Sequence, residues 1–249
     1  MTDQELTHDQ LPVAARERME RWLTSDGLRR HLEKALDTGR RPARTGPYIA
    51  ISREAGSGGL PIARSVAEQL GWDVLDKEIL DFMAERYGVP RGMLEFVDET
   101  KANWVHDVLS SWFDTKVVSH EKFVVYLERI VFLAAMYGHV VFVGRGAQCI
   151  LPQTSGLSVR LVAPLEWRIQ RRMNRHKVSR SQARKEIEEI ETGRREFYRR
   201  YFQHDSSTAS DFDLVLNVSR FSSSMIARQI VEAFERIELD VAPNSNIHV

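Results

Sequence analysis

Residues 48–70 place an apolar run, a glycine-rich loop and an amphipathic helix in direct succession. The run at 48–51 is typical of a strand buried in a parallel sheet, and apolar residues recur at helical spacing from 62 to 70. Glycines between the two segments allow positive φ and close backbone approach, so that N–H groups and the positive helix end can converge on a phosphate. The pattern predicts an α/β fold with a phosphate-binding loop at Gly56, Ser57, Gly58 and Gly59.

The loop departs from the common phosphate-binding pattern G-x-x-x-x-G-K-[ST]. In that pattern the lysine reaches the β- and γ-phosphates and the hydroxyl meets magnesium. If Gly58 is the last glycine of the pattern, Gly59 stands at the lysine position and Leu60 at the Ser/Thr position. A Gly-Ser-Gly-Gly string alone would more often be a plain turn, but the flanking strand and helix favour a phosphate loop. Catalysis then needs a cation from another part of the chain.

The composition fits one sizeable globular domain, because 43% of the 249 residues are hydrophobic and 28% are charged. The formal net charge is zero, so no global field attracts nucleic acid or an anionic membrane. Cys149 is the single cysteine and the first residues lack the pattern of a secretory signal, so we expect a cytoplasmic location. The longest apolar stretch, 130–143, is too short to span a membrane and predicts a helix, a turn and a buried strand.

The rest of the chain alternates predicted strands with predicted helices. Short apolar runs predict further strands at 72–75, 139–143, 157–163 and 212–218, and a last helix is expected at 225–237. Such alternation is typical of a parallel sheet covered by helices.

We expect three regions, with two special segments in the second. Residues 1–46 form a helical arm and linker that would pack on the core or on a second subunit, residues 47–238 form the core, and residues 239–249 form a flexible tail. Within the core, residues 81–137 form a helical insertion that either adds to the core or closes over a second substrate. Residues 174–206 are expected to form a lid.

Charged residues follow two of the predicted strands at the ends that would face a ligand. Asp76 and Lys77 follow the strand at 72–75, and Arg145 follows the strand at 139–143 with a glycine on each side. The carboxyl ends of parallel strands line the ligand crevice, and a guanidinium fork fits phosphate geometry. Two simpler alternatives stay open, because Asp76 could cap a helix and Arg145 could pair with a carboxylate.

A strongly basic region extends from Arg160 to Arg200. It holds thirteen Lys or Arg residues against six Glu and no Asp, an excess of seven positive charges. Arg168 and Arg172 lie four residues apart on one predicted helix face and could bracket a polyphosphate. Ser179 is expected to cap a second helix, much of whose charge would be solvated surface.

In order and spacing, these segments resemble the cytidylate kinase-like group of the P-loop nucleoside monophosphate kinases. The resemblance covers about 48–237 and depends on ISREAGSGG at 51–59, DKEIL at 76–80, GRGA at 144–147, RLVAPLEWRIQRR at 160–172, RREFYRRYF at 194–202 and FDLVLNVSR at 212–220. It implies a P-loop kinase-type three-layer fold with a five-stranded parallel sheet, a helical monophosphate-binding insertion and an arginine-rich lid. It also implies transfer of the ATP γ-phosphate to CMP or dCMP with Mg²⁺, the metal having no assigned protein ligand.

The resemblance suggests roles for individual residues. Residues 56–59 match the phosphate loop, and Asp76 with Lys77 lies where the acceptor nucleoside would be approached. Arg145 matches an arginine that holds the acceptor phosphate. The positions near the donor phosphates and lid are matched by Arg168, Arg172, Arg194 and Arg199.

The missing loop lysine marks a departure within the resemblance. Cytidylate kinases proper have lysine where Gly59 stands, whereas the kinase-like group often follows Gly-Ser-Gly-Gly with an arginine, and here that residue is Leu60. Phosphoryl transfer depends mostly on positioning and charge neutralisation, so we hypothesise that Arg53 or Arg172 supplies the missing charge. The expected catalytic set is therefore Arg53, Arg145, Arg172 and Arg194.

Three functions remain open. A nucleotide kinase, whose partners are a nucleoside triphosphate and a nucleoside monophosphate, explains the loop, Arg145 and the lid together. A degenerate kinase that binds nucleotide without turnover explains the lost lysine. A basic nucleic-acid module is least favoured, because the arginines alternate with Glu and no nucleic-acid fold signature is present. No membrane partner is expected, and a homodimer is compatible with the N-terminal arm.

Overall fold

The computed structural model describes residues 45–86, 119–203 and 208–237, together with positions 13 and 17. In this part of the chain five strands form one parallel sheet in the order β2-β3-β1-β4-β5. The α/β class and the five-stranded parallel sheet are therefore confirmed. The strands are β1 (Tyr48–Arg53), β2 (Asp73–Leu75), β3 (Val140–Val143), β4 (Gly156–Val162) and β5 (Leu214–Asn217).

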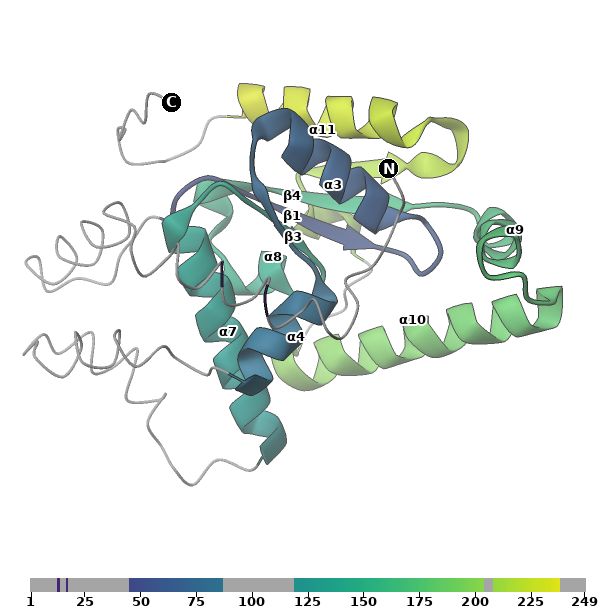
Figure 1. Ribbon diagram of the computed structural model, residues 1–249, viewed down its shortest axis with the longest axis horizontal. Coiled ribbons are helices and arrows are strands. Elements are labelled where there is room, and N and C mark those ends of the chain that lie inside the picture. The colour runs from purple at the N-terminus through teal and green to yellow at the C-terminus, as the bar shows by residue number, and fades with distance from the viewer. Residues whose placement is uncertain (1–12, 14–16, 18–44, 87–118, 204–207, 238–249) are drawn as a thin grey trace, which may run out of the picture.

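Helices cover both faces of the sheet (Figure 1). One face carries α3 (Gly59–Leu70) and α11 (Ser223–Arg236), and the other carries α4 (Lys77–Arg86), α7 (Ser119–Tyr137) and the short α8 (Ala147–Ile150). Beyond the carboxyl ends of the strands lies α9 (Leu165–His176), from which α10 (Arg180–Phe202) runs back toward α4 and α8. The loop after β1 and the basic helices therefore lie at the same end of the sheet.

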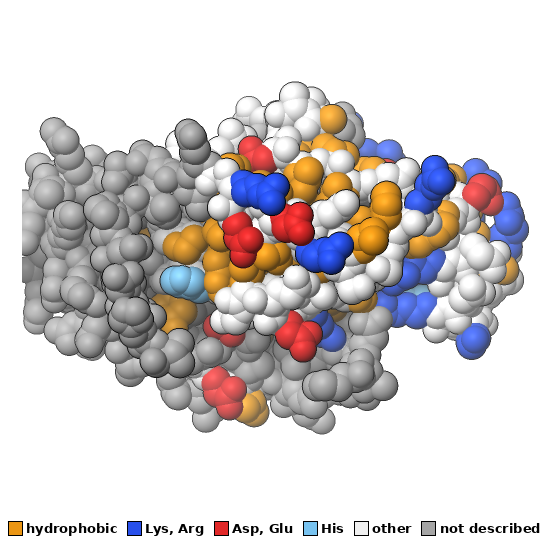
Figure 2. Space-filling view, turned by 90° about the horizontal axis from the view of Figure 1, so that it is seen from above, with side chains coloured by type: hydrophobic (Ala, Val, Ile, Leu, Met, Phe, Trp, Pro, Cys, Tyr) orange, Lys and Arg blue, Asp and Glu red, His pale blue; other side chains and the backbone are white. Residues whose placement is uncertain are grey.

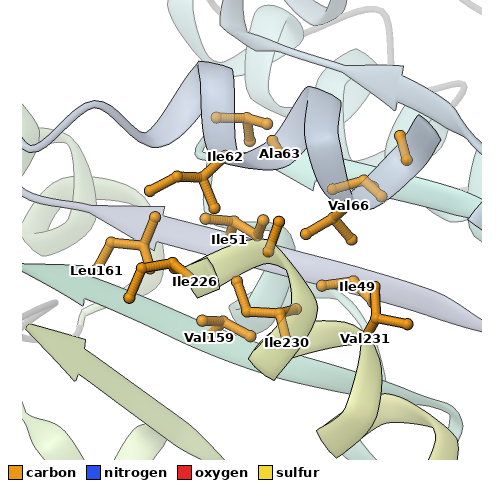
Figure 3. Packing of buried hydrophobic residues seen from close by; sticks show 14 of the residues in the cluster. Ile49, Ile51, Ile62, Ala63, Val66, Val159, Leu161, Ile226, Ile230 and Val231 are labelled. Atoms are coloured by element: carbon orange, nitrogen blue, oxygen red, sulfur yellow. The ribbon is translucent and has the colours of Figure 1, made fainter. Parts of the chain in front are cut away.

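The central strand β1 contributes side chains to a hydrophobic cluster on each face. Ile49 and Ile51 pack beneath α3 and α11, whereas Tyr48 and Ala50 pack against α4 and α7. Figure 3 shows side chains of α3 and α11 meeting over those of β1 and β4. Because successive strand residues point to opposite faces and both faces are buried, β1 is a continuous apolar run in sequence.

The helix α7 belongs to the same cluster as β1 and β3. Its residues Leu127, Ile130, Val131 and Ala134 are buried there. This helix lies within the predicted insertion at 81–137, whose middle part, 87–118, is outside the described residues. The insertion, the arm at 1–46 and the tail at 239–249 stay predictions.

The ends of several elements match the sequence patterns. The Ser179 hydroxyl accepts a hydrogen bond from the Gln182 N–H at 3.2 Å, which confirms the predicted cap of α10. The last strand is shorter than the predicted 212–218, because the 3₁₀ turns at 209–211 and 218–220 bound it on both sides.

Among the described residues, no helix combines the length and apolar character needed to cross a membrane.

Two valines on neighbouring strands, one buried and one exposed, allow a test of core packing. Val159 on β4 is fully buried, whereas Val215 on the neighbouring edge strand β5 is 41% exposed. We expect Val159→Ala to lower the free energy of unfolding by about 2–3 kcal/mol, because two buried methyl groups are lost and a cavity remains. Val215→Ala should change it by less than about 0.5 kcal/mol in denaturant titrations. Equal effects would contradict the described burial.

Candidate active site

The loop between β1 and α3 forms a tight turn that directs the chain into the helix. Gly56 and Gly58 take positive φ values of 82° and 86°, in the left-handed region that favours glycine. The Ser57 N–H and hydroxyl both donate to the Glu54 carbonyl, at 3.2 Å and 2.8 Å, and close the turn. The predicted glycine loop at a helix N-terminus is present, and the Ser57 hydroxyl is used to shape it.

A network of charged groups fixes this loop from behind. The Glu54 carboxylate accepts a hydrogen bond from the Ala163 N–H at 2.8 Å, and the Ala55 N–H donates to the Glu191 carboxylate at 2.7 Å. Arg168, only 8% exposed, donates to the carbonyls of Ala55 and Ala163 and lies 3.1 Å from the Glu191 carboxylate and 3.4 Å from that of Glu54. The loop is thereby tied to the end of β4 and to α10.

Two pockets meet at the loop. The larger, of about 520 Å³, is walled by the ends of β1, β2 and β3 and by α10, and the smaller, of about 270 Å³, lies between the loop and α9. Arg53, Arg172 and Arg194 line both pockets. Figure 2 shows Lys and Arg side chains gathered at the end of the molecule where α9 lies.

Arg53 spans the junction of the pockets in a channel formed by two glycines. A Cβ atom on Gly59 would lie 2.8 Å from Arg53 Cγ, and one on Gly144 would overlap Arg53 Nη1. Burial is the main cause that lowers the pKa of Arg53 to about 10; Arg194 and Arg145 add to this effect, and Tyr198 and Glu78 oppose it. The group is therefore still protonated at neutral pH. Among the described residues, its guanidinium has no hydrogen-bond or ion-pair partner.

Arg194 lies beside Arg53 and donates to its backbone carbonyl at 2.7 Å. Burial also lowers the pKa of Arg194, and the positive charges of Arg160 and Arg145 add to this effect. Several half-buried cations therefore share one region, where they repel each other. An anion bound among them would relieve that repulsion.

Arg145 and Arg172 lie in the pocket walls and are paired with carboxylates. Arg145 forms a two-pronged pair with Asp81, including an Nε–Oδ1 contact of 2.5 Å, and lies over the Phe197 ring at 5.2 Å. Arg172 Nε lies 2.5 Å from Glu186 Oε2. The alternative in which Arg145 pairs with a carboxylate is thus what the structure shows, although Arg145 still lines the larger pocket.

The remaining predicted site residues are Asp76, Lys77, Arg168 and Arg199, and only some of them line a pocket. Asp76 is 6% exposed and caps α4, because its carboxylate accepts a hydrogen bond from the Ile79 N–H at 3.1 Å. Lys77 forms an ion pair with Asp81 at 3.3 Å. Asp76 and Lys77 both line the larger pocket. Arg199 is exposed and lines neither pocket. Arg168 and Arg172 do not bracket a common space, because Arg168 is turned into the network behind the loop.

Two arginines of the site were given no role by the sequence argument. Arg171 lies against Gly58, where an added Cβ would be 2.5 Å from Nη2, and it stacks over Trp167 at 5.5 Å. Arg160 lines the larger pocket and donates to the Ser52 hydroxyl at 3.1 Å. An aromatic residue four positions before Arg171 was the available signal for the first, since such residues are neighbours on a helix.

Comparisons with known proteins concern the family and the fold. The model of the cytidylate kinase-like family matches residues 48–220. An uncharacterized protein from Eubacterium ventriosum ATCC 27560 is similar in structure, with a TM-score of 0.59 and 21% identity over 76% of this chain and 97% of that chain, which shows a shared fold. A shikimate kinase from Bacteroides thetaiotaomicron aligns with a TM-score of 0.42 and 15% identity over 75% of this chain and 97% of that one. No curated protein sequence matches the chain.

The loop network predicts different effects for two neighbouring arginines of α9. Arg168→Ala leaves the carboxylates of Glu54 and Glu191 without their shared cation, so we expect a loss of about 2–4 kcal/mol in the free energy of unfolding. Arg171→Ala removes only an outer stacking contact and should cost less than about 0.5 kcal/mol. Urea titrations of both variants test this, and a mild effect of Arg168→Ala would contradict the anchoring role.

Proposed function

Because the chain belongs to the cytidylate kinase-like family, we propose that it transfers the γ-phosphate of ATP to a nucleoside monophosphate, with CMP or dCMP as the acceptor. The family membership rests on the match over residues 48–220. The observation that carries the proposal is the pair of adjoining pockets that share Arg53, Arg172 and Arg194. Two ligands in these pockets would meet between three guanidinium groups.

The smaller pocket is the proposed donor site. Its wall contains the glycine loop at the N-terminus of α3, whose amides and helix dipole favour a phosphate. Arg171, Arg172 and Arg175 extend along its other wall from α9. Arg168 acts here by positioning the loop, whereas the exposed Arg199 lies outside both pockets and receives no role at this site.

The larger pocket is the proposed acceptor site. Arg145 would exchange the carboxylate of Asp81 for the acceptor phosphate, because both oxyanions accept the same two-pronged guanidinium fork. Asp76 and Lys77 line the same pocket and are placed to meet the nucleoside. The base preference for cytosine comes from the resemblance.

The reaction in this proposal is a direct displacement at phosphorus. The bond from the γ-phosphorus to the bridging β–γ oxygen breaks, and its electron pair stays with ADP. A new bond forms from the γ-phosphorus to an oxygen of the acceptor phosphate. That oxygen is already an anion, so no general base is needed, and catalysis consists of positioning and charge neutralisation.

Mg²⁺ would enter with the nucleotide. The described residues contain no group of three or more His, Cys, Asp and Glu side chains that could hold a metal ion. Mg²⁺ usually keeps several waters and binds substrate phosphates with the help of one or two carboxylates. In the larger pocket Asp76 and Glu78 are carboxylates of that kind. When bound, the ion would neutralise charge on the phosphates.

A second candidate function is nucleotide binding without turnover, as in a regulator. It is favoured by Gly59 and Leu60, which replace the lysine and the hydroxyl of the common loop pattern. A nucleic-acid module is the third candidate. A cytoplasmic location and a homodimer stay predictions in all three cases.

A coupled assay separates these functions. Purified protein is mixed with ATP, Mg²⁺ and each of a panel of nucleoside monophosphates, and ADP formation is followed. We expect turnover with CMP or dCMP. Tight ATP binding without turnover would select the regulator, and salt-sensitive binding to DNA or RNA without nucleotide binding would select the third function.

The shared wall of the pockets predicts a large effect of one α10 arginine. Arg194→Ala removes a cation from the junction, so kcat/KM should fall by about 10²–10³-fold, as for loss of one preorganised donor. Arg200→Ala, on the same helix but outside both pockets, is the matched control and should stay within about twofold. Unchanged turnover in Arg194→Ala would remove this residue from the catalytic set.

A further inference from the structure

We infer that Arg53, at the end of β1, takes the place of the missing loop lysine, and that residue 59 is glycine because the stem of Arg53 fills the space of its side chain. The inference deepens the proposed function, since it presumes a phosphate chain at the glycine loop. It names Arg53 as the cation that would contact the transferred phosphate. It also explains why the loop has glycine at position 59, since the stem of Arg53 occupies that space.

The reason for glycine at position 59 is space. Gly56 and Gly58 have positive φ, but Gly59 does not, so its backbone conformation is open to any residue. An added Cβ would lie 2.8 Å from Cγ and 3.1 Å from Cβ of Arg53. These atoms are at the root of the arginine side chain, and their position is fixed by β1 within the sheet. Arg53 and a side chain at position 59 therefore exclude each other.

The head of Arg53 is held where a phosphate would be transferred. It rests against Gly144 at the end of β3 and lines both pockets. Arg172, the other candidate for the missing charge, has its Nε bound to Glu186 at 2.5 Å. The guanidinium of Arg53 has no such hydrogen-bonded or ion-paired partner among the described residues, and the charges that act on it are the cations Arg194 and Arg145 and, in the opposite sense, Tyr198 and the carboxylate of Glu78. This environment favours a bound polyanion, and of the two candidates it points to Arg53.

The first test measures binding of inorganic tripolyphosphate, which has no base or sugar. We expect it to raise the melting temperature of the wild-type protein. Arg53→Met keeps the stem without the charge and should abolish most of that shift, while Arg53→Lys should retain part of it. Arg200→Ala, outside both pockets, is the matched control and should show the full shift. In the coupled assay Arg53→Met should lower kcat/KM by about 10²-fold or more.

The second test is a double-mutant cycle on the two positions. Gly59→Ala alone should displace Arg53 and reduce the tripolyphosphate shift and turnover about as much as Arg53→Met does. In the R53A background the same Gly59→Ala change should have a much smaller effect on binding, because the Cγ atom that the new side chain would meet at 2.8 Å is gone and only the Cβ contact at 3.1 Å remains. Strong non-additivity of this kind reports contact between the two residues.

The third test moves the charge. Gly59→Lys in the R53A background restores the common loop pattern in the space that Arg53 leaves, and it should recover at least about tenfold of the kcat/KM lost in R53A. Gly59→Lys with Arg53 retained should lose activity, because the two side chains compete for space.

Several outcomes would overturn the inference. One is wild-type affinity for tripolyphosphate and wild-type turnover in Arg53→Met, and another is an equal effect of Gly59→Ala in both backgrounds. A wild-type protein that does not bind tripolyphosphate would also overturn it. Arg53-dependent tripolyphosphate binding without any kinase turnover would support the inference while contradicting the proposed function, so the two failures can be told apart.

Discussion

Repulsion among half-buried guanidinium groups is the constraint on which the site depends. Burial is the main cause that lowers the pKa of Arg53 to about 10, and the charges of Arg194 and Arg145 add to it against the opposite effects of Tyr198 and Glu78. Such an arrangement is unfavourable in the absence of an anion. It persists because the backbone of these residues is held by β1, by the turn after β3 and by α10, and these segments are supported by the hydrophobic clusters of the core.

Carboxylates around the site limit this repulsion in the unliganded protein. Asp81 holds Arg145, Glu186 holds Arg172, and Glu191 accepts from the Ala55 amide at the entrance of the loop. The two arginine–carboxylate pairs are of a kind that a phosphate oxygen can replace, whereas the Glu191 contact belongs to the network that anchors the loop. Binding of a polyphosphate would therefore exchange internal ion pairs for ligand contacts, and only the difference between the two sets contributes to affinity.

Much of the fold was predictable because its signals are local. The apolar run of β1, the positive-φ glycines and the Ser179 cap each depend on residues within a few positions of one another. The roles of Arg168 and Arg171 were not predictable in the same way. Helical spacing places them in adjacent rows, but which row turns behind the loop depends on the packing of α9 against α10, which no local pattern encodes. The Arg145–Asp81 pair joins residues 64 positions apart and needs the sheet order to be known.

In the arrangement that we propose for Arg53, a strand rather than a loop supplies the charge. A lysine in the loop extends from the first turn of a helix on a flexible stem, whereas Arg53 extends from a strand that pairs on both sides with β3 and β4. The root of its side chain is therefore fixed by the register of the sheet, and less conformational entropy is lost when a phosphate binds. This arrangement restricts the chain elsewhere, because the side chain needs free space at Gly59 and again at Gly144. Gly144 also takes a positive φ of 84°, which favours glycine by itself, whereas the space that Arg53 occupies is the reason that the structure gives for Gly59.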